Sequence, residues 1–226
     1  MENQILTDSA FEALRQKATP LEAEGFDRGV WLLDDGRIMK LFRFKKLLTS
    51  DSLFPYNRRF VRNSKMLVAA GIPTVGDARC FKLPSRKCGG VFYHPLEGDT
   101  LRELGMAGQL NTKLCADIGR FTAFVHNKGI LFRSIHPGNI VREKGGRMGF
   151  IDIADVSRQW WPLQASQRQR NFRHMFRSSR ENTYFTEARR KTLIEAYLDV
   201  CPSKLASDSQ FRAAVLNAAL GSPVKR

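Results

Sequence analysis

The N-terminal part of the chain consists of short apolar runs separated by turn residues. The runs GVWLL (29–33) and RIMKLF (37–42) flank Asp34-Asp35-Gly36, and an Asp-Gly pair between two such runs is typical of a β-hairpin. Further strands are predicted at 77–83 and 90–93, on either side of the basic turn PSRKCGG. This pattern predicts a small antiparallel sheet.

Helical signals interrupt and then replace the strands. Ser9 and Glu12 form a capping box for a short first helix, and Gly71 with Pro73 ends a longer helix predicted over 55–70. After His94-Pro95 the apolar residues recur at helical spacing. The helices predicted there cover 109–128, 163–177, 186–200 and 208–220. We therefore predict the α+β class, in one domain over 1–226 with a β-rich N-lobe (about 1–93) and an α-helical C-lobe (about 94–226).

Composition adds a strong positive charge to this picture. The formal net charge is +15 and the pI is about 10.1, which favours acidic partners such as anionic lipid headgroups, phosphorylated substrates or nucleic acid, although a solvated basic surface without a partner is an open alternative. The start of the chain has no apolar core typical of a signal peptide, and no apolar run is long enough to span a bilayer. The four cysteines have no metal-ligand spacing and are predicted to be reduced, partly buried thiols of a cytosolic protein.

The segment LFRSIHPGNIVREKGGRMGFIDIAD (131–155) contains the clearest candidate chemistry. Asn139 and Asp152 lie 13 residues apart on either side of a Gly-Gly turn, a spacing that a β-hairpin needs to bring both ends to one metal ion. In kinases an Asn and an Asp in this order hold the Mg²⁺ ions on ATP. The sequence therefore predicts a kinase-type metal site.

Lys40 is the matching candidate in the N-terminal sheet. It stands in the apolar strand IMKLF, where its neighbours Met39 and Leu41 point to the opposite face. A lone lysine at such a position is more often solvated than functional. With Asn139 and Asp152 downstream, the position is the one from which a kinase lysine contacts the phosphates of ATP.

These motifs resemble a known family. LFRSIHPGNIV is similar to the loop HGDLHPGNI, and FIDIAD to the metal-binding LIDFGD, of the small atypical kinase-like proteins that include aminoglycoside and lipopolysaccharide kinases. Together with GRIMKLFRFKKLLTS and PYNRRFVRNSKMLVAAGIPT they resemble the bacterial lipopolysaccharide core kinase family, nearest the branch labelled toluene-tolerance protein. The resemblance runs from about residue 25 to about residue 197. It implies a small two-lobed protein-kinase-like fold that uses ATP and Mg²⁺ to phosphorylate heptose or Kdo sugars of the lipopolysaccharide inner core.

The resemblance also assigns roles to individual residues. It implies that Lys40 binds the nucleotide phosphates and that Asn139 and Asp152 ligate Mg²⁺. Gly25 and Gly29, in the turn EGFDRG, would cover the phosphates, and Tyr93 lies in the stretch expected to contact adenine.

Two positions depart from the kinase pattern. Asn63 occupies the place of the Glu that usually pairs with the strand lysine. Ser134, five residues before Asn139, replaces the Asp that receives the substrate hydroxyl proton, and a serine hydroxyl has no useful basicity near neutral pH. His136, on the same loop, and Asp155, three residues past Asp152, are the candidates to take over this role, and His136 is preferred. A purely structural His136 is the open alternative.

The basic segment 158–180 is the candidate for partner binding. Arg170, His174 and Arg177 share one helical face, which favours contact with phosphorylated lipopolysaccharide core, another phosphorylated glycolipid or the anionic inner membrane, but also fits a solvated helix. No nucleic-acid-binding motif is present, so nucleic acid is disfavoured as a partner. The expected function is an ATP-dependent sugar kinase at the cytoplasmic face of the inner membrane; the alternative is a pseudokinase that binds nucleotide or lipopolysaccharide precursor and acts in envelope assembly or regulation.

Overall fold

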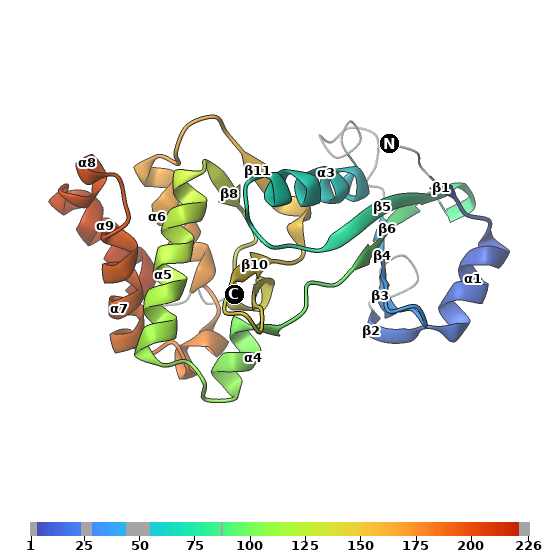
Figure 1. Ribbon diagram of the computed structural model, residues 1–226, viewed down its shortest axis with the longest axis horizontal. Helices are drawn as coiled ribbons and strands as arrows, with labels where there is room; N and C mark the ends of the chain where they lie inside the picture. The colour runs from blue at the N-terminus through green and yellow to red at the C-terminus, as the bar shows by residue number, and fades with distance from the viewer. Residues whose placement is uncertain (1–3, 24–28, 44–54, 87, 222–226) are drawn as a thin grey trace. The chain divides into compact units, whose positions relative to one another are not determined.

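The computed structural model of the protein describes residues 4–23, 29–43, 55–86 and 88–221 (Figure 1). The chain divides into two compact units. The first comprises Met1–Leu96 and Phe150–Ala154, and the second Glu97–Gly149 and Asp155–Arg226. The first unit is built on a sheet and the second mainly on helices, which confirms the predicted α+β class.

Six strands of the first unit form one sheet in the order β1-β5-β6-β4-β3-β2. Neighbouring strands are antiparallel except for β1, which runs parallel to β5. The predicted hairpin and the later strand pair are confirmed, whereas the two-residue β1 has no sequence signal of its own. The strands are β1 (Gln4–Ile5), β2 (Thr19–Ala23), β3 (Gly29–Leu32), β4 (Ile38–Arg43), β5 (Gly76–Leu83) and β6 (Cys88–His94).

Two described helices belong to this unit. The predicted long helix is confirmed as α3 (Tyr56–Ala69), and Gly71 beyond it has a φ of +78°. The short helix α1 (Asp8–Lys17) begins earlier than the capping box at Ser9 predicted. Thr7 is the N-cap instead, because its extended backbone lets its hydroxyl accept a hydrogen bond from the Ala10 amide at 3.2 Å.

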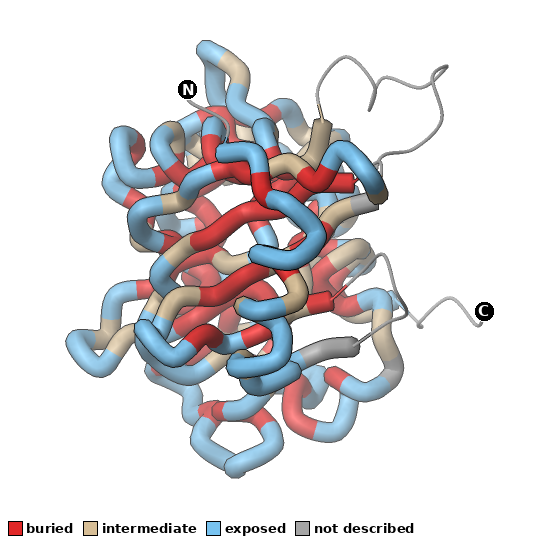
Figure 2. The backbone as a smooth tube through the Cα atoms, turned by 90° about the vertical axis from the view of Figure 1, so that its right-hand side faces the viewer, coloured by how far each residue is buried: buried red, intermediate tan, exposed pale blue. Residues whose placement is uncertain are grey.

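One hydrophobic core cluster of the first unit lies where α1 meets the sheet. Phe11 of α1 packs edge-on against Trp31 of β3 with ring centroids 6.1 Å apart, and the two belong to one cluster of buried residues. Figure 2 shows such buried stretches along the strands, broken by exposed turns. The other buried members of this cluster are Leu6, Leu33, Met39, Leu41, Phe81, Leu83, Cys88 and Phe92.

The second unit contains two small sheets and a set of helices. β7 (Asp99–Thr100), β9 (Ile140–Arg142) and β10 (Met148–Phe150) form the sheet β10-β9-β7, with Phe150 counted in the first unit, and β8 (Ile130–Phe132) pairs antiparallel with β11 (Val156–Arg158). The predicted later helices are confirmed, while α4 and α8 lack a long periodic pattern. The helices are α4 (Leu101–Met106), α5 (Thr112–Asn127), α6 (Ala165–Met175), α7 (Glu187–Leu198), α8 (Ser203–Ala206) and α9 (Ser209–Leu220).

A glycine allows α5 and α7 to pack closely. A Cβ atom at Gly119 of α5 would lie 2.1 Å from the carbonyl oxygen of Leu193 in α7, closer than non-bonded atoms approach. A larger residue at this position would therefore push the two helices apart.

A buried polar network connects these helices to β8. The Arg168 side chain, although it belongs to the basic segment 158–180, is fully buried and donates to the Tyr197 hydroxyl at 3.0 Å. His126 lies between the Tyr197 hydroxyl, 3.0 Å from Nδ1, and the Asn171 Oδ1 atom, 3.1 Å from Nε2. Asn171 in turn donates to the Phe132 carbonyl at 2.9 Å. The network therefore anchors the end of β8, directly before Arg133 and Ser134.

Lowering the pH from 7 to 5 is expected to destabilise the protein through His126. Burial, and next the nearby Arg168 charge, lower the pKa of His126 from 6.5 to about 3. The unfolded chain therefore takes up a proton below about pH 6.5 that the folded protein excludes, and the free energy of unfolding falls by up to about 1.4 kcal/mol per pH unit as the pH drops toward 3. Urea unfolding at several pH values measures this slope. His126→Gln should flatten this slope, and an unchanged slope in that variant would contradict the assignment.

Candidate functional site

An ion pair between Lys40 and Asp152 is the centre of the candidate site in the first unit. Lys40 Nζ lies 2.6 Å from Asp152 Oδ1, although 112 residues separate the two in the chain. Lys40 is in β4, opposite Val30 of β3 and Val91 of β6, and its side chain is 18% exposed. The Asp152 side chain is 47% exposed. A pair so accessible to water contributes about 1 kcal/mol or less to stability, so stability alone does not account for its presence.

The backbone around Asp152 is fixed by hydrogen bonds inside the first unit. Asp152 has a φ of +53°, in the left-handed region that L-residues adopt at a cost of about 1–2 kcal/mol. The Asn63 side-chain amide of α3, 2% exposed, donates to the Ile153 carbonyl at 2.8 Å and to the Ala154 carbonyl at 3.4 Å. On the other side, the Thr74 hydroxyl donates to the Phe150 carbonyl at 2.7 Å. These bonds hold the strained residue and orient its carboxylate.

The contacts of Asn63 differ from those of the kinase Glu whose place it is predicted to take. Its amide nitrogen donates to the backbone carbonyl of Ile153, next to Asp152. The carboxylate that pairs with Lys40 is that of Asp152. No local sequence signal indicates this contact, because the residues that Asn63 binds lie 90 positions away. The predicted contact between Asn63 and a nucleotide stays a prediction.

The other residues predicted to bind the nucleotide are placed as follows. Gly25 lies outside the described residues. Gly29 is buried in β3, where a Cβ atom would lie 2.2 Å from the Trp31 ring, so tight packing accounts for this glycine. The Tyr93 ring in β6 packs against Phe60 of α3 with centroids 5.0 Å apart. Their contacts with a nucleotide stay predictions.

Ser134 and Asp155 meet in the second unit. The antiparallel pairing of β8 with β11 continues beyond Phe132 and Val156 through a hydrogen bond from the Arg133 amide to the Asp155 carbonyl at 3.3 Å. The two chain segments therefore stay adjacent, and the Ser134 hydroxyl donates to Asp155 Oδ2 at 3.2 Å. The site thus places the Asp155 carboxylate next to Ser134, the residue predicted to stand at the position of the kinase catalytic Asp.

The loop after Ser134 is held by its own side chains. His136 Nδ1 accepts a hydrogen bond from the Gly138 amide at 3.1 Å, and the Asn139 amide donates to the Ser134 carbonyl at 3.0 Å. In neutral His136 this bond places the proton on Nε2, which leaves neither ring nitrogen ready to take a proton from a substrate. The geometry places the Asp155 carboxylate, and not the His136 ring, against Ser134, and the choice of proton acceptor stays a prediction.

The residues predicted to ligate Mg²⁺ offer suitable atoms. The Asp152 carboxylate is half exposed, and the Asn139 amide oxygen remains for a metal when the amide nitrogen binds Ser134. Oxygen donors of these two kinds are those that Mg²⁺ takes in proteins. Asn139 and Asp152 belong to different units, and their shared metal site stays a prediction. Within the described part of the chain, no group of three or more His, Cys, Asp and Glu residues could hold a metal ion.

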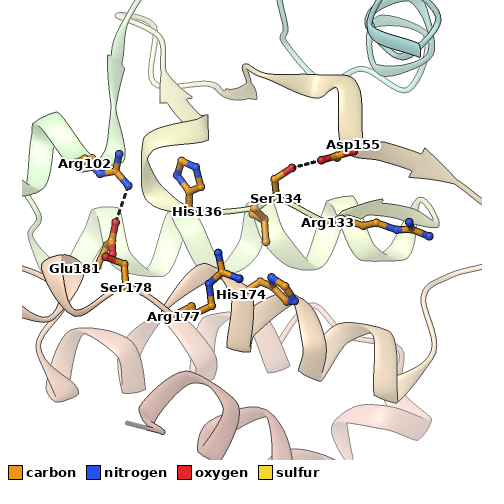
Figure 3. Close-up of a pocket in the computed structure, with 10 residues that line it drawn as sticks. Arg102, Arg133, Ser134, His136, Asp155, His174, Arg177, Ser178 and Glu181 are labelled. Carbon is orange, nitrogen blue, oxygen red and sulfur yellow. Dashed lines mark hydrogen bonds and ion pairs between the residues drawn. The ribbon is translucent and has the colours of Figure 1, made fainter. Parts of the chain in front are cut away.

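A pocket in the second unit opens beside Ser134 and Asp155 (Figure 3). Its volume is about 420 Å³. At one end, Arg102 of α4 pairs with the fully buried Glu181 at 2.8 Å, and this pairing raises the pKa of Arg102. No local sequence signal indicates this pair, because 79 residues separate its members. The pocket is lined by Arg102, Arg133, Ser134, Ile135, His136, Asp155, His174, Arg177, Ser178 and Glu181.

Two features of the described chain bear on membrane contact: the character of its helices and a pair of exposed tryptophans. None of the described helices has both the length and the apolar character required to cross a bilayer. Trp160 is 98% exposed and Trp161 is also exposed, beside the exposed Arg158. Exposed tryptophans next to basic residues are typical of membrane-interface contacts.

The comparisons with known proteins reveal similarity only at the level of structure. No protein-family profile matches the chain, and no curated protein matches it. A structure of WbdD with a kinase inhibitor aligns over 84% of this chain and 48% of WbdD, with 14% identity and a TM-score of 0.45. A structure of the bifunctional kinase-methyltransferase WbdD aligns over 85% of this chain and 47% of its own, with 13% identity and a TM-score of 0.43. A third WbdD structure, at 12% identity and a TM-score of 0.45, aligns over 88% of this chain and 50% of its own. The chain spans about half the length of these WbdD chains.

Proposed function

We propose that the protein is an ATP-dependent kinase that phosphorylates a sugar of the lipopolysaccharide inner core, heptose or Kdo. The observation that carries this proposal is the Lys40–Asp152 pair, in which a strand lysine meets the carboxylate that follows the β9–β10 hairpin at 2.6 Å. A strand lysine and a metal-binding Asp in this order are the groups with which kinases hold ATP and Mg²⁺. The sugar acceptor is inferred from the family resemblance of the sequence.

Each charged group has a defined task in this proposal. The Lys40 ammonium would bind the nucleotide phosphates, and the oxygens of Asp152 and Asn139 would hold Mg²⁺. When bound, Mg²⁺ neutralises the charge that develops on the transferred phosphoryl group. The bond between the γ-phosphorus and the β,γ-bridging oxygen breaks, the acceptor oxygen forms the new bond to phosphorus, and the acceptor proton moves to the Asp155 carboxylate. Ser134, donating to Asp155 at 3.2 Å, orients that carboxylate.

Transfer of labelled phosphate tests the proposal. The protein is incubated with Mg²⁺ and ATP labelled at the γ-position, with delipidated lipopolysaccharide core as acceptor, and label in the oligosaccharide is counted. Metal-dependent labelling above a protein-free control is expected. No labelling over many hours would contradict the kinase proposal.

A pseudokinase is the second candidate, and Ser134 is the observation that favours it. A serine at this position has no carboxylate of its own to take a proton. In this alternative the Lys40–Asp152 pair binds nucleotide without turnover, and the protein acts in envelope assembly or regulation. Nucleotide binding without any labelled product would support it.

Replacing Asp155 with asparagine is expected to lower kcat by about 10²–10⁴-fold, the range that general acid–base assistance contributes. Asparagine preserves the shape and the contact with Ser134 but cannot accept the proton. The rate of phosphate transfer at saturating acceptor measures the effect. Asp117→Asn, which replaces a half-buried aspartate of α5 that pairs with Arg120, is the matched control and should retain activity. Equal rates in both variants would show that Asp155 is not the proton acceptor.

A further inference from the structure

We propose that Arg177 and His174 form an anion subsite in the pocket beside Ser134 and Asp155, which binds a negatively charged oxygen group on the acceptor. The ligand class is an acidic sugar, in which a phosphate or carboxylate accompanies the hydroxyl that is to be modified. Its identity as the acceptor rests on the proposed kinase function; the subsite itself rests on this pocket alone.

The geometry of the pocket places two basic side chains opposite the proton acceptor's loop. Figure 3 shows the Arg177 guanidinium pointing toward the loop that contains Ser134 and His136, with the His174 ring beside it near the end of α6. Arg177 lies just beyond α6, where its amide donates to the His174 carbonyl at 3.4 Å. In the described parts of the chain no carboxylate forms an ion pair with Arg177. Its charge is therefore available to a ligand.

The charge balance of the pocket favours an anion. The carboxylates among its described lining residues are Asp155 and Glu181, and Glu181 is already neutralised by Arg102. The pKa of His174 is lowered first by burial and then by the positive charges of Arg177, Arg170 and Arg173. An anionic group bound here would reduce the repulsion among these cations, so it would gain energy that a neutral sugar does not.

One wall of the pocket is rigid before any ligand binds. A Cβ atom at Gly138 would lie 2.6 Å from Arg102 Nη1, so glycine lets this loop pack closely on the guanidinium and a larger residue would displace the end of the Arg102 side chain. Glu181, which is fully buried, holds Arg102 from the other side. Because this wall is already ordered, little conformational entropy is lost when a ligand enters.

Interaction with the helix dipole is the competing explanation for the position of Arg177 and His174 at the C-terminal end of α6. Cations at the C-terminal turn of a helix are stabilising by about 0.3–1 kcal/mol whether or not a ligand is present. Arg173 in the last turn of α6 serves the dipole equally well but does not line the pocket. Arg173 is therefore the matched control that separates the two explanations.

Binding of glucose 6-phosphate, compared with glucose, tests the subsite without any need for turnover. By calorimetric titration we expect the phosphate sugar to bind wild-type protein, Arg173→Gln and Lys40→Met alike, the last because the subsite is independent of the nucleotide lysine. Arg177→Gln should bind it about 10–100-fold more weakly, the loss expected for one charge-assisted hydrogen bond. Glucuronic acid in the same titration distinguishes a carboxylate from a phosphate ligand. No binding to wild type, or equal binding by Arg177→Gln, would overturn the subsite.

Transfer kinetics then separate the subsite from the kinase proposal. With phosphorylated and dephosphorylated core oligosaccharides as acceptors, Arg177→Gln should raise KM for the phosphorylated acceptor by about 10–100-fold and leave KM for the dephosphorylated one unchanged. If Arg177 binds the acidic sugars but wild type transfers no phosphate, the kinase proposal fails and the subsite stands. If phosphate is transferred and KM is unchanged for both acceptors, the subsite is wrong and the kinase proposal stands.

Discussion

Replacing Asp152 with asparagine is expected to reduce phosphate transfer by about 10³-fold or more, since preorganised charge at the transferring group is the largest catalytic contribution in such reactions. Asparagine tolerates the φ of +53° as aspartate does, and has nearly the same size. The variant should therefore fold with the wild-type stability. What it lacks is the negative charge that pairs with Lys40 and the anionic oxygen proposed to bind Mg²⁺. Initial rates of labelled-phosphate transfer measure the loss.

Asp77 provides the matched control for this substitution. Within the described chain, Asp77 and Asp152 are the non-glycine residues with a positive φ, and the φ of Asp77 is 49°. Asp77 is exposed and pairs with Arg79. Asp77→Asn therefore repeats the chemical change at a left-handed position outside the proposed site. Transfer by Asp77→Asn should equal that of wild type. Equal transfer by Asp152→Asn and Asp77→Asn would refute the metal role of Asp152.

Replacing Lys40 with methionine is expected to weaken ATP binding by about 10–100-fold, because a hydrogen bond to a charged group contributes about 1.5–3 kcal/mol. Methionine retains the apolar length of the side chain in β4 but removes the ammonium group. Asp152 then loses its partner, yet with nearly half of its side chain exposed it stays solvated, so stability should change by about 1 kcal/mol or less. Titration with a fluorescent ATP analogue measures the affinity, and thermal unfolding measures the stability.

Lys82 in β5 is the matched control for Lys40. It is a partly buried lysine in a strand of the same sheet. Lys82→Met should bind ATP as wild type does. If both methionine variants lose affinity equally, the effect comes from net charge and not from a specific phosphate contact.

Much of the fold was predictable because its elements have local signals. The Asp-Gly hairpin between β3 and β4, the Gly71 stop of α3 and the periodic apolar face of α5 each depend on neighbouring residues. The Ser9 cap was wrong because Thr7 and Ser9 are both good capping residues, and only the backbone conformation selects between them.

The candidate site was predictable only where its residues carry kinase-like spacing. Lys40 and Asp152 were identified from sequence, and the structure brings them to 2.6 Å. In contrast, Arg168 lies in the basic segment 158–180 but is buried, and Tyr197, Asn127 and the Leu163 carbonyl accept its hydrogen bonds. These partners lie up to 41 residues away. A pattern within one helix could not identify them.

The relation between His136 and Asp155 likewise depends on non-local geometry. From the sequence, His136 was preferred because it shares the loop of Ser134. In the structure, the Nδ1 atom of His136 accepts a hydrogen bond from the Gly138 amide. The pairing of β8 with β11 brings Asp155 next to Ser134. Strand pairing between distant segments is set by the whole fold, so the sequence alone could not rank the two.

Calorimetric titration of wild-type protein with ATP, in Mg²⁺ and then in EDTA, tests the central claim most directly. The claim is that Lys40 and Asp152 form a site for the phosphates and metal of ATP. We predict saturable binding that is strong with Mg²⁺, weaker with EDTA, and weaker in Lys40→Met than in Lys82→Met. No detectable binding in either buffer, or equal binding with and without Mg²⁺, would contradict the account.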